Sequence, residues 1–315
     1  MTERLFEKVV EAARRIRPEA VETPLERSPS LSRLTGAEVY LKWENRQVTG
    51  SFKFRGAMNK IRSLSPQEKA RGAVTASTGN HGLASSLAAR LEGLDLTLVL
   101  PTGVSGEKRR RLAETGTKIL EIGKSCEQAE VSARRLARET DRVYISPYND
   151  EEVIAGQGTI GVEIAAVLPR AVTVLVPVGG GGLVSGIAAY LKPALKAVEI
   201  LGVEPETSAF MKASFAAGRI VEIEEGETIA DAVAGGLEPG SITFPLCQRL
   251  IDGIITVREQ AIRQAMSLLF EHHGQMVEGA GALALAALLS EKARFRGRPV
   301  ALIVSGGNVT SAFFR

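Results

Sequence analysis

Residues 172–183 read Val-Thr-Val-Leu-Val-Pro-Val-Gly-Gly-Gly-Gly-Leu, an apolar run that ends in four consecutive glycines. A continuous run of β-branched and other apolar residues predicts a strand that is buried on both faces of a parallel sheet. Glycines between a strand and a helix let the backbone wrap around a phosphate, and the N-terminus of the helix adds attraction. Residues 179–182 are therefore a candidate phosphate site. The spacing Gly180, Gly182, Gly186, with Glu204 about 20 residues on, also leaves a dinucleotide site open.

The same alternation of apolar runs and helical spacing continues along the chain and indicates an α/β fold with parallel sheets covered on both faces. Strands are predicted at 39–43, 73–77, 96–101, 118–122, 142–146, 172–178, 199–203, 254–257 and 300–304. Helices are predicted at 82–91, 128–138, 153–168, 183–191 and 259–271.

The composition excludes several classes of protein. The chain has 315 residues, 44% of them hydrophobic, with a net charge of +3 spread along its length, so we expect neither a disordered chain nor a nucleic-acid partner. The longest apolar stretch, 280–289, is far shorter than the ~20 residues of a membrane span. The N-terminus lacks the apolar core of a secretory signal, and two distant cysteines form no disulfide framework. These features predict a soluble, cytoplasmic protein that binds no membrane.

Two domains are expected for this length. Turn-forming and charged residues cluster at 63–71 and 146–150. The sequence thus predicts a small domain, residues 72–146, inserted into a large domain made of residues 1–71 and 147–315.

Lys53 is the candidate nucleophile. It lies in Gly50-Ser51-Phe52-Lys53-Phe54-Arg55-Gly56-Ala57, where Ser51 is expected to cap a helix and Lys53 to lie in its first turn between two phenylalanines. Apolar neighbours and a helix N-terminus both lower the pKa of a lysine. Taken alone, the segment is more typical of a lysine that extends to solvent.

Two further segments with candidate ligand-binding residues follow predicted strands. Ser77-Thr78-Gly79-Asn80-His81 offers hydroxyls, an amide and free backbone N–H groups to an anion. Ser305-Gly306-Gly307-Asn308 follows the last strand and exposes a hydroxyl. Because ligands of open parallel sheets bind at the carboxyl ends of strands, these segments and the glycine run can surround one ligand. A lysine, an anion loop, a phosphate loop and a hydroxyl together describe a pyridoxal-phosphate site.

These motifs resemble the fold-type II pyridoxal-phosphate enzymes, specifically the group of serine/threonine dehydratases (threonine ammonia-lyases) and serine racemases. The likeness runs from Thr23-Pro24-Leu25 through the lysine motif and 153–159 (Val-Ile-Ala-Gly-Gln-Gly-Thr) to Ser305-Gly306-Gly307-Asn308. It implies two open, mostly parallel twisted sheets flanked by helices, a tryptophan synthase β-like fold with the cofactor between the domains. It also implies a homodimer or homotetramer, and no C-terminal regulatory domain of the biosynthetic type.

The resemblance assigns a role to each matched residue. Lys53 forms the Schiff base with the cofactor and then acts as a base, and Phe52 packs against the cofactor ring. Asn80 bonds the phenolic oxygen and Ser305 the pyridine nitrogen. The backbone of Gly179, Gly180, Gly181, Gly182 and Leu183 holds the phosphate. Ser77, Thr78, Gly79 and His81 receive the substrate carboxylate, and Ser77 and Thr78 are also candidate catalytic residues.

The implied activity is elimination of the β-hydroxyl of L-threonine or L-serine to give a 2-oxo acid and ammonia. The alternatives are a serine racemase and a dehydratase of another β-hydroxy amino acid, such as one of the hydroxyectoine pathway. Thr78 replaces the serine of racemase-like members, and Ala230-Asp231-Ala232-Val233 replaces Ala-Asp-Gly-Val. Glu204 resembles the start of the group's cation site, but Phe210 stands where a second acid is expected. A divalent or monovalent cation therefore stays open.

Overall fold

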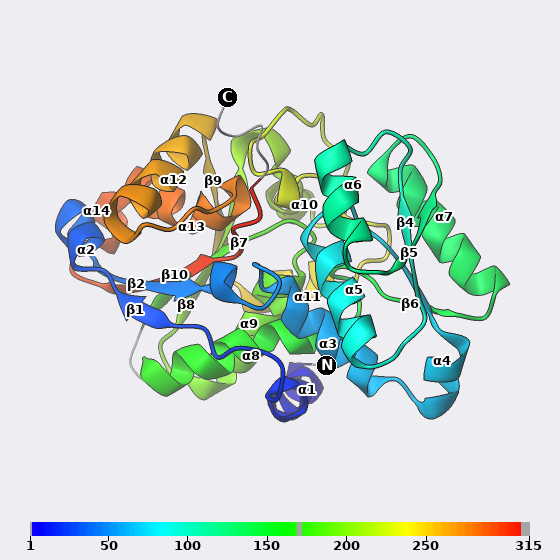
Figure 1. Ribbon diagram of the computed structural model, residues 1–315. Coiled ribbons are helices and arrows are strands. Elements are labelled where there is room, and N and C mark those ends of the chain that lie inside the picture. Colours follow the sequence, from blue (N-terminus) through cyan, green and yellow to red (C-terminus); the bar gives the residue numbers. More distant parts are fainter. Residues whose placement is uncertain (1, 169–171, 310–315) are drawn as a thin grey trace.

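The computed structural model describes residues 2–168 and 172–309, which form two β-sheets with helices on their faces (Figure 1). The large sheet has the strand order β1-β2-β10-β7-β8-β9. The β1 strand runs antiparallel to β2, and all other neighbours are parallel. Its strands are β1 (Leu25–Arg27), β2 (Glu38–Trp43), β7 (Thr173–Pro177), β8 (Glu199–Pro205), β9 (Gly253–Val257) and β10 (Pro299–Val304).

The small sheet has the order β5-β4-β3-β6 and is parallel throughout. Its strands are β3 (Ala73–Ala76), β4 (Leu96–Leu100), β5 (Lys118–Glu121) and β6 (Val143–Tyr144). The structure confirms every predicted strand and the α/β fold of mostly parallel sheets. Only β1 was not predicted from sequence, since it has three residues and no apolar alternation.

Helices cover both faces of each sheet (Figure 1). They are α1 (Thr2–Ile16), α2 (Pro29–Thr35), α3 (Lys53–Ser63), α4 (Pro66–Arg71), α5 (Asn80–Leu91), α6 (Gly106–Ala113), α7 (Cys126–Glu139), α8 (Glu151–Val167), α9 (Gly182–Ala194), α10 (Phe210–Ala217), α11 (Thr243–Leu250), α12 (Glu259–His273), α13 (Gly279–Ser290) and α14 (Lys292–Phe295). Short 3-10 helices are η1 (Glu44–Arg46), η2 (Glu206–Ser208) and η3 (Asp231–Val233). Among residues 2–168 and 172–309, no helix is long and apolar enough to cross a membrane.

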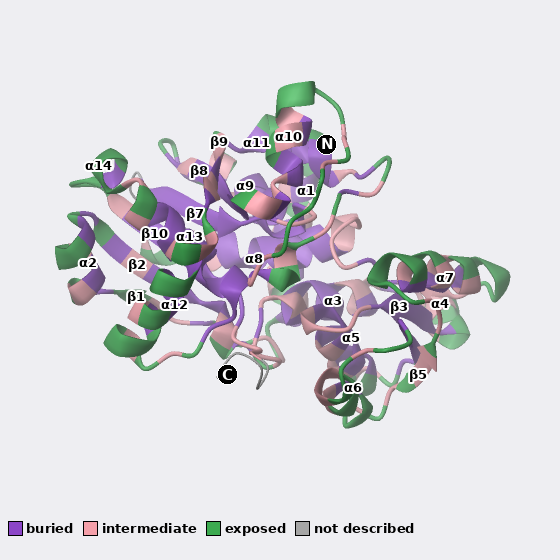
Figure 2. Ribbon diagram, turned by 90° about the horizontal axis from the view of Figure 1, so that it is seen from above, coloured by how far each residue is buried: buried purple, intermediate pink, exposed green. Residues whose placement is uncertain are grey.

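The β7 strand shows why the large sheet is covered on both sides. Val174 and Val176 pack into the core formed with α1, α8, α9 and α11, whereas Leu175 points to the opposite core, formed with α12 and α13. A period of two therefore places apolar side chains on both faces, as the continuous apolar run predicts. Figure 2 shows these central strands as the most continuously buried part of the molecule.

Helix α3 connects the two parts of the molecule. It packs against α8 on one side and α5 on the other, and Phe54, Met58 and Ile61 belong to the core under the small sheet. The predicted domain borders at 71/72 and 146/147 stay predictions. The helix that carries Lys53 is thus held from both parts.

Candidate active site

The lysine motif and the serine motif lie side by side. Ser51 forms an isolated antiparallel bridge with Gly306, and the backbone N–H of Phe52 donates to the carbonyl of Ser305 at 3.1 Å. The expectation that Ser51 caps the following helix is wrong. Phe52 occupies the cap position, and the Ser51 hydroxyl is buried without a hydrogen-bond partner among the described residues. The long-range pairing with Gly306 fixes the Ser51 backbone, so its side chain does not cap the helix.

Lys53 is the first residue of α3, as predicted. Its Nζ donates to the carbonyl oxygen of Pro147 at 2.8 Å and lies 5.1 Å from the centre of the Phe52 ring. Burial lowers the pKa of Lys53 to about 8, although Glu278 acts in the opposite direction. The unprotonated fraction of this amine near neutral pH is therefore larger than that of an exposed lysine, which favours its use as a nucleophile or base.

The Asn80 side chain, at the start of α5, faces a buried carboxylate. Its Nδ2 donates to Oε1 of Glu278 at 2.7 Å, and its Oδ1 accepts from Nδ2 of Asn308 at 2.7 Å. Glu278 was not identified from sequence, where 280–289 was noted only as an apolar stretch. A single acid directly before an apolar helix of small residues was the signal that could have found it.

The loop before α5 contains the predicted carboxylate residues. Ser77 Oγ accepts from the N–H of Gly79 at 3.2 Å, and Thr78 is half-buried. The His81 side chain turns into the core, where its Nε2 lies 3.0 Å from Thr75 Oγ1. Burial and then the charge of Lys53 lower the pKa of His81 to about 3. The ring is thus neutral and directed away from the loop, which leaves the backbone of His81 for the predicted role.

The glycine turn presents bare backbone at the start of α9. A Cβ on Gly180 would come within 2.3 Å of the Tyr148 ring, and one on Gly182 within 3.1 Å of Tyr148 Cα. Gly181 has φ +81°, a conformation that favours glycine. The first N–H groups of a helix have no partner within the helix, so those at the start of α9 are available to an anion. Tyr148, which sequence reasoning missed, forms the wall opposite this turn.

Glu204 is buried near the end of β8. Its carboxylate accepts from the N–H groups of Met211 and Lys212 at 2.8 and 2.9 Å, and it therefore caps α10. Each oxygen of this carboxylate accepts one backbone N–H, and the dinucleotide and cation interpretations of Glu204 stay predictions.

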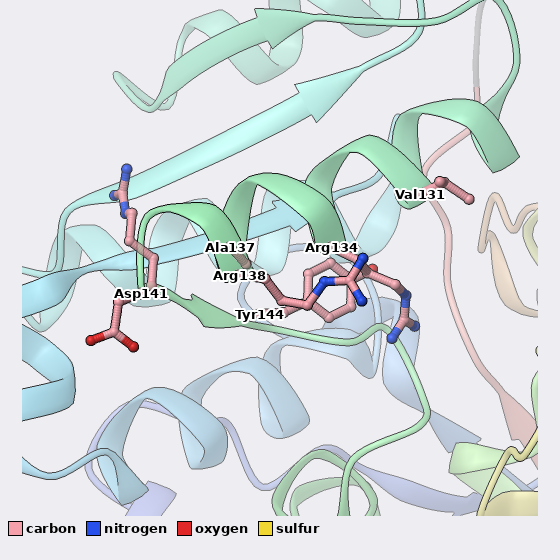
Figure 3. Close-up of a pocket in the computed structure, with 7 residues that line it drawn as sticks. Val131, Arg134, Ala137, Arg138, Asp141 and Tyr144 are labelled. Atoms are coloured by element: carbon pink, nitrogen blue, oxygen red, sulfur yellow. The ribbon is translucent and has the colours of Figure 1, made fainter.

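Three contacts join the small-sheet part to the large-sheet part beside these groups. Lys108 pairs with Asp231 at 3.0 Å and Arg134 with Glu238 at 2.5 Å, while Arg111 donates to Asn308 Oδ1 at 2.6 Å. The cavity of about 600 Å³ in Figure 3 lies elsewhere, along α7 and β6. Its lining includes none of the predicted site residues.

The arrangement fits a phosphorylated aldehyde cofactor. It combines a lysine of lowered pKa, a glycine turn that side chains would fill, an oriented amide and a buried serine. Fold and site together define a two-sheet α/β enzyme with a candidate cofactor site at Lys53. The chain belongs to the family of pyridoxal-phosphate dependent enzymes, whose model matches residues 16–306. Its cofactor is pyridoxal phosphate.

Relatives of known name are similar over nearly the whole chain. An L-threonine ammonia-lyase from Thermotoga maritima is 41% identical over 304 residues, 96% of this chain and 75% of the relative. The processed form of threonine deaminase isoform 2 from Solanum lycopersicum has a TM-score of 0.94 and 34% identity, with 100% of this chain and 87% of that one covered. Maize serine racemase has a TM-score of 0.93 and 35% identity, over 98% and 95% of the two chains.

Proposed function

We propose that this protein is a pyridoxal-phosphate-dependent ammonia-lyase that eliminates the β-hydroxyl of L-threonine or L-serine and yields a 2-oxo acid and ammonia. The observation that carries the proposal is the placement of Lys53, the half-buried first residue of α3, whose Nζ bonds the Pro147 carbonyl and lies beside the Phe52 ring; its lowered pKa agrees with this role. The names of the relatives that are about 40% identical to this chain support the reaction type.

The cofactor, when bound, supplies an electron sink for the bond to the substrate Cα. We assign its phosphate to the backbone of 179–183 and its phenolic oxygen to Asn80. Ser305, which is buried at the end of β10, would face the ring nitrogen, and Phe52 the ring. A neutral hydroxyl stabilises a protonated ring nitrogen less than a carboxylate does. The electron sink is then weaker, which favours prompt loss of the β-hydroxyl.

Lys53 moves the α-proton in this proposal. Its Nζ, unprotonated in part at neutral pH, accepts the proton from the substrate Cα once the substrate has taken its place at the cofactor. The loop 77–81 would bind the substrate carboxylate through the hydroxyls of Ser77 and Thr78 and the N–H groups at the start of α5. The β-hydroxyl would take up a proton and leave as water, and a second water would then hydrolyse the enamine product to the oxo acid and ammonia.

The test is a panel of β-hydroxy amino acids assayed for ammonia and oxo-acid release. L-Threonine and L-serine should be the best substrates, and borohydride should fix the cofactor to a Lys53 peptide. A protein loaded with pyridoxal phosphate that gives no such peptide contradicts the assignment. A third β-hydroxy amino acid turned over about tenfold faster than both would favour the hydroxyectoine-type alternative.

A serine racemase is the second candidate, favoured by the similarity to maize serine racemase. Racemisation needs an acid or base on each face of the Cα, and the Thr78 hydroxyl is the candidate opposite Lys53. The β-branch of threonine restricts χ1, so we expect elimination to be much faster than racemisation. Thr78→Ser should raise D-serine formation from L-serine. Wild-type protein that makes D-serine as fast as pyruvate would favour the racemase.

We also propose a homodimer or homotetramer in the cytoplasm. Cys126 and Cys247 are both free, and one is exposed, which agrees with a reducing compartment. Light scattering of the purified protein at several concentrations tests the oligomeric state.

A further inference from the structure

Four side chains from separate segments form one directed chain of hydrogen bonds. Arg111 on α6 donates to Asn308 Oδ1 at 2.6 Å, and Asn308 donates to Asn80 Oδ1 at 2.7 Å. Asn80 then donates to Glu278 Oε1 at 2.7 Å. Because each group in the middle both accepts and donates, the bonds polarise one another in the same direction. The chain starts on a small-sheet helix and ends on a carboxylate directly before α13.

A count of donors shows what this chain does to Asn80. A side-chain amide has two N–H donors and one carbonyl oxygen with two lone pairs. Asn308 occupies the carbonyl of Asn80, and Glu278 takes one N–H. One N–H remains for a ligand. The Glu278 oxygen accepts that N–H and so favours this orientation over the rotated amide, which would turn its own oxygen toward Glu278.

Glu278 lies inside the candidate site. It is buried, and a Cβ on Gly306 would come within 2.4 Å of its Oε1. Its own N–H donates to the Gly306 carbonyl at 3.3 Å, next to Ser305. Its charge also acts on the amine of Lys53. The carboxylate is therefore packed against the same loop that would meet the cofactor ring.

We propose that Glu278 is a positioning residue that acts through Asn80: it holds the Asn80 amide with its one remaining N–H directed at the negatively charged phenolic oxygen of the cofactor, while Arg111 and Asn308 fix the other end of that amide. This inference rests on the proposed function. In this arrangement Asn80 offers an N–H to the cofactor oxygen.

The decisive measurement is the dissociation constant of pyridoxal phosphate in a Lys53→Ala background, where no covalent bond to the lysine contributes. Glu278→Ala should raise it about tenfold, since the amide is then free to rotate. Glu278→Gln keeps an acceptor oxygen without the charge. Its dissociation constant should stay within about threefold of that of the Lys53→Ala protein. A glutamine variant as weak as the alanine variant would mean that the charge matters and not the orientation, which overturns the proposal.

A double-mutant cycle separates positioning from general damage. Asn80→Ala combined with Glu278→Ala should bind no more weakly than Asn80→Ala alone, because Glu278 acts only through Asn80. If the losses of binding free energy of the two single variants add in the double variant, Glu278 does not act through Asn80 alone. Arg111→Ala should weaken binding about threefold, whereas Arg110→Ala, whose partner is Glu114 on the same helix, should not.

The protein that keeps Lys53 provides a second readout. A hydrogen bond to the phenolic oxygen affects the absorption maximum of the bound cofactor, so Glu278→Ala should shift that maximum and Glu278→Gln should restore it. If wild type forms no borohydride-trapped Lys53 adduct, the proposed function fails. If wild type forms it and the Glu278 variants match wild type in affinity and spectrum, only the present inference fails.

Discussion

Lys53 and Arg55 are two residues apart on α3 and have opposite surroundings. The Arg55 guanidinium bonds Glu44 at 2.8 and 2.9 Å and Glu163 at 2.5 and 2.9 Å. Lys42 also pairs with Glu163, so two cations meet two carboxylates. Burial alone would lower the pKa of Arg55, but Glu44 and Glu163 raise it. Lys53 instead bonds one neutral carbonyl.

The two side chains differ in charge balance: Arg55 is fully buried among carboxylates, whereas Lys53 is half-buried without a bonded carboxylate. Around Arg55 the charges cancel and the donors are used, so the cluster holds α3 in one position. Around Lys53 and Glu278 the compensation is incomplete, and burial moves their pKa values to about 8 and about 7. Groups that titrate near neutrality can exchange protons with a substrate. The same helix thus carries a structural cation and a chemical one.

Lys53→Ala should have the largest effect. Loss of the amine removes both the cofactor anchor and the base, and we expect turnover of L-serine to fall by at least about 10³-fold. Circular dichroism should stay near wild type, since no ion pair is broken. Activity within tenfold of wild type would show that the wrong lysine was assigned.

Arg55→Ala should show the opposite pattern. It leaves Glu44 and Glu163 buried without their main cation, so the free energy of unfolding should fall by about 3–5 kcal/mol. Urea unfolding at pH 7 measures it. Arg294→Ala is the control, because its side chain is 38% exposed and pairs at the surface; we expect a loss within about 1 kcal/mol. Equal losses in both variants would contradict a special role for the buried cluster.

The next prediction concerns how stability depends on pH at Glu278, whose charge is less well compensated than the charges around Arg55. In the cofactor-free protein, the pKa of Glu278 is raised by burial from 4.5 to about 7. The folded state then binds its proton more tightly, and this contribution is present below pH 4.5 and lost as the pH rises through 7. Relative to Glu278→Gln, wild type should lose up to about 3 kcal/mol over that window. The subtraction cancels other groups, such as His81.

Lys53 should have the opposite effect on stability at higher pH. Its pKa is lowered from 10.5 to about 8, so the unfolded state binds more protons between these values and stability rises with pH across them. Urea unfolding of wild type and Lys53→Met from pH 7 to 10.5 tests this. A constant difference between the two proteins would mean that the amine is not desolvated.

The sequence predicted the features that depend on local pattern. The apolar run 172–178 gave β7, and glycines after a strand marked the turn before α9. Features that depend on distant contacts were missed or wrong. Glu278 meets Asn80 across 198 positions of sequence, and Ser51 lost its expected cap role to a bridge with Gly306. The direction of the His81 side chain follows from packing under β3, which no residue pattern encodes.

Arg55→Lys should have the smallest effect and sharpens the comparison most. Lysine keeps the positive charge but has no planar fork, so it cannot bond Glu44 and Glu163 in pairs. We expect a loss of about 2 kcal/mol in the free energy of unfolding, between wild type and Arg55→Ala. Turnover per folded molecule should stay within about threefold of wild type. The substituted lysine still supplies a positive charge to Glu44 and Glu163, so α3 and Lys53 keep their positions. If turnover falls more than tenfold while the protein remains folded at the assay temperature, the Arg55 cluster helps to set the chemistry of Lys53. The division of α3 into a structural and a chemical cation would then be wrong.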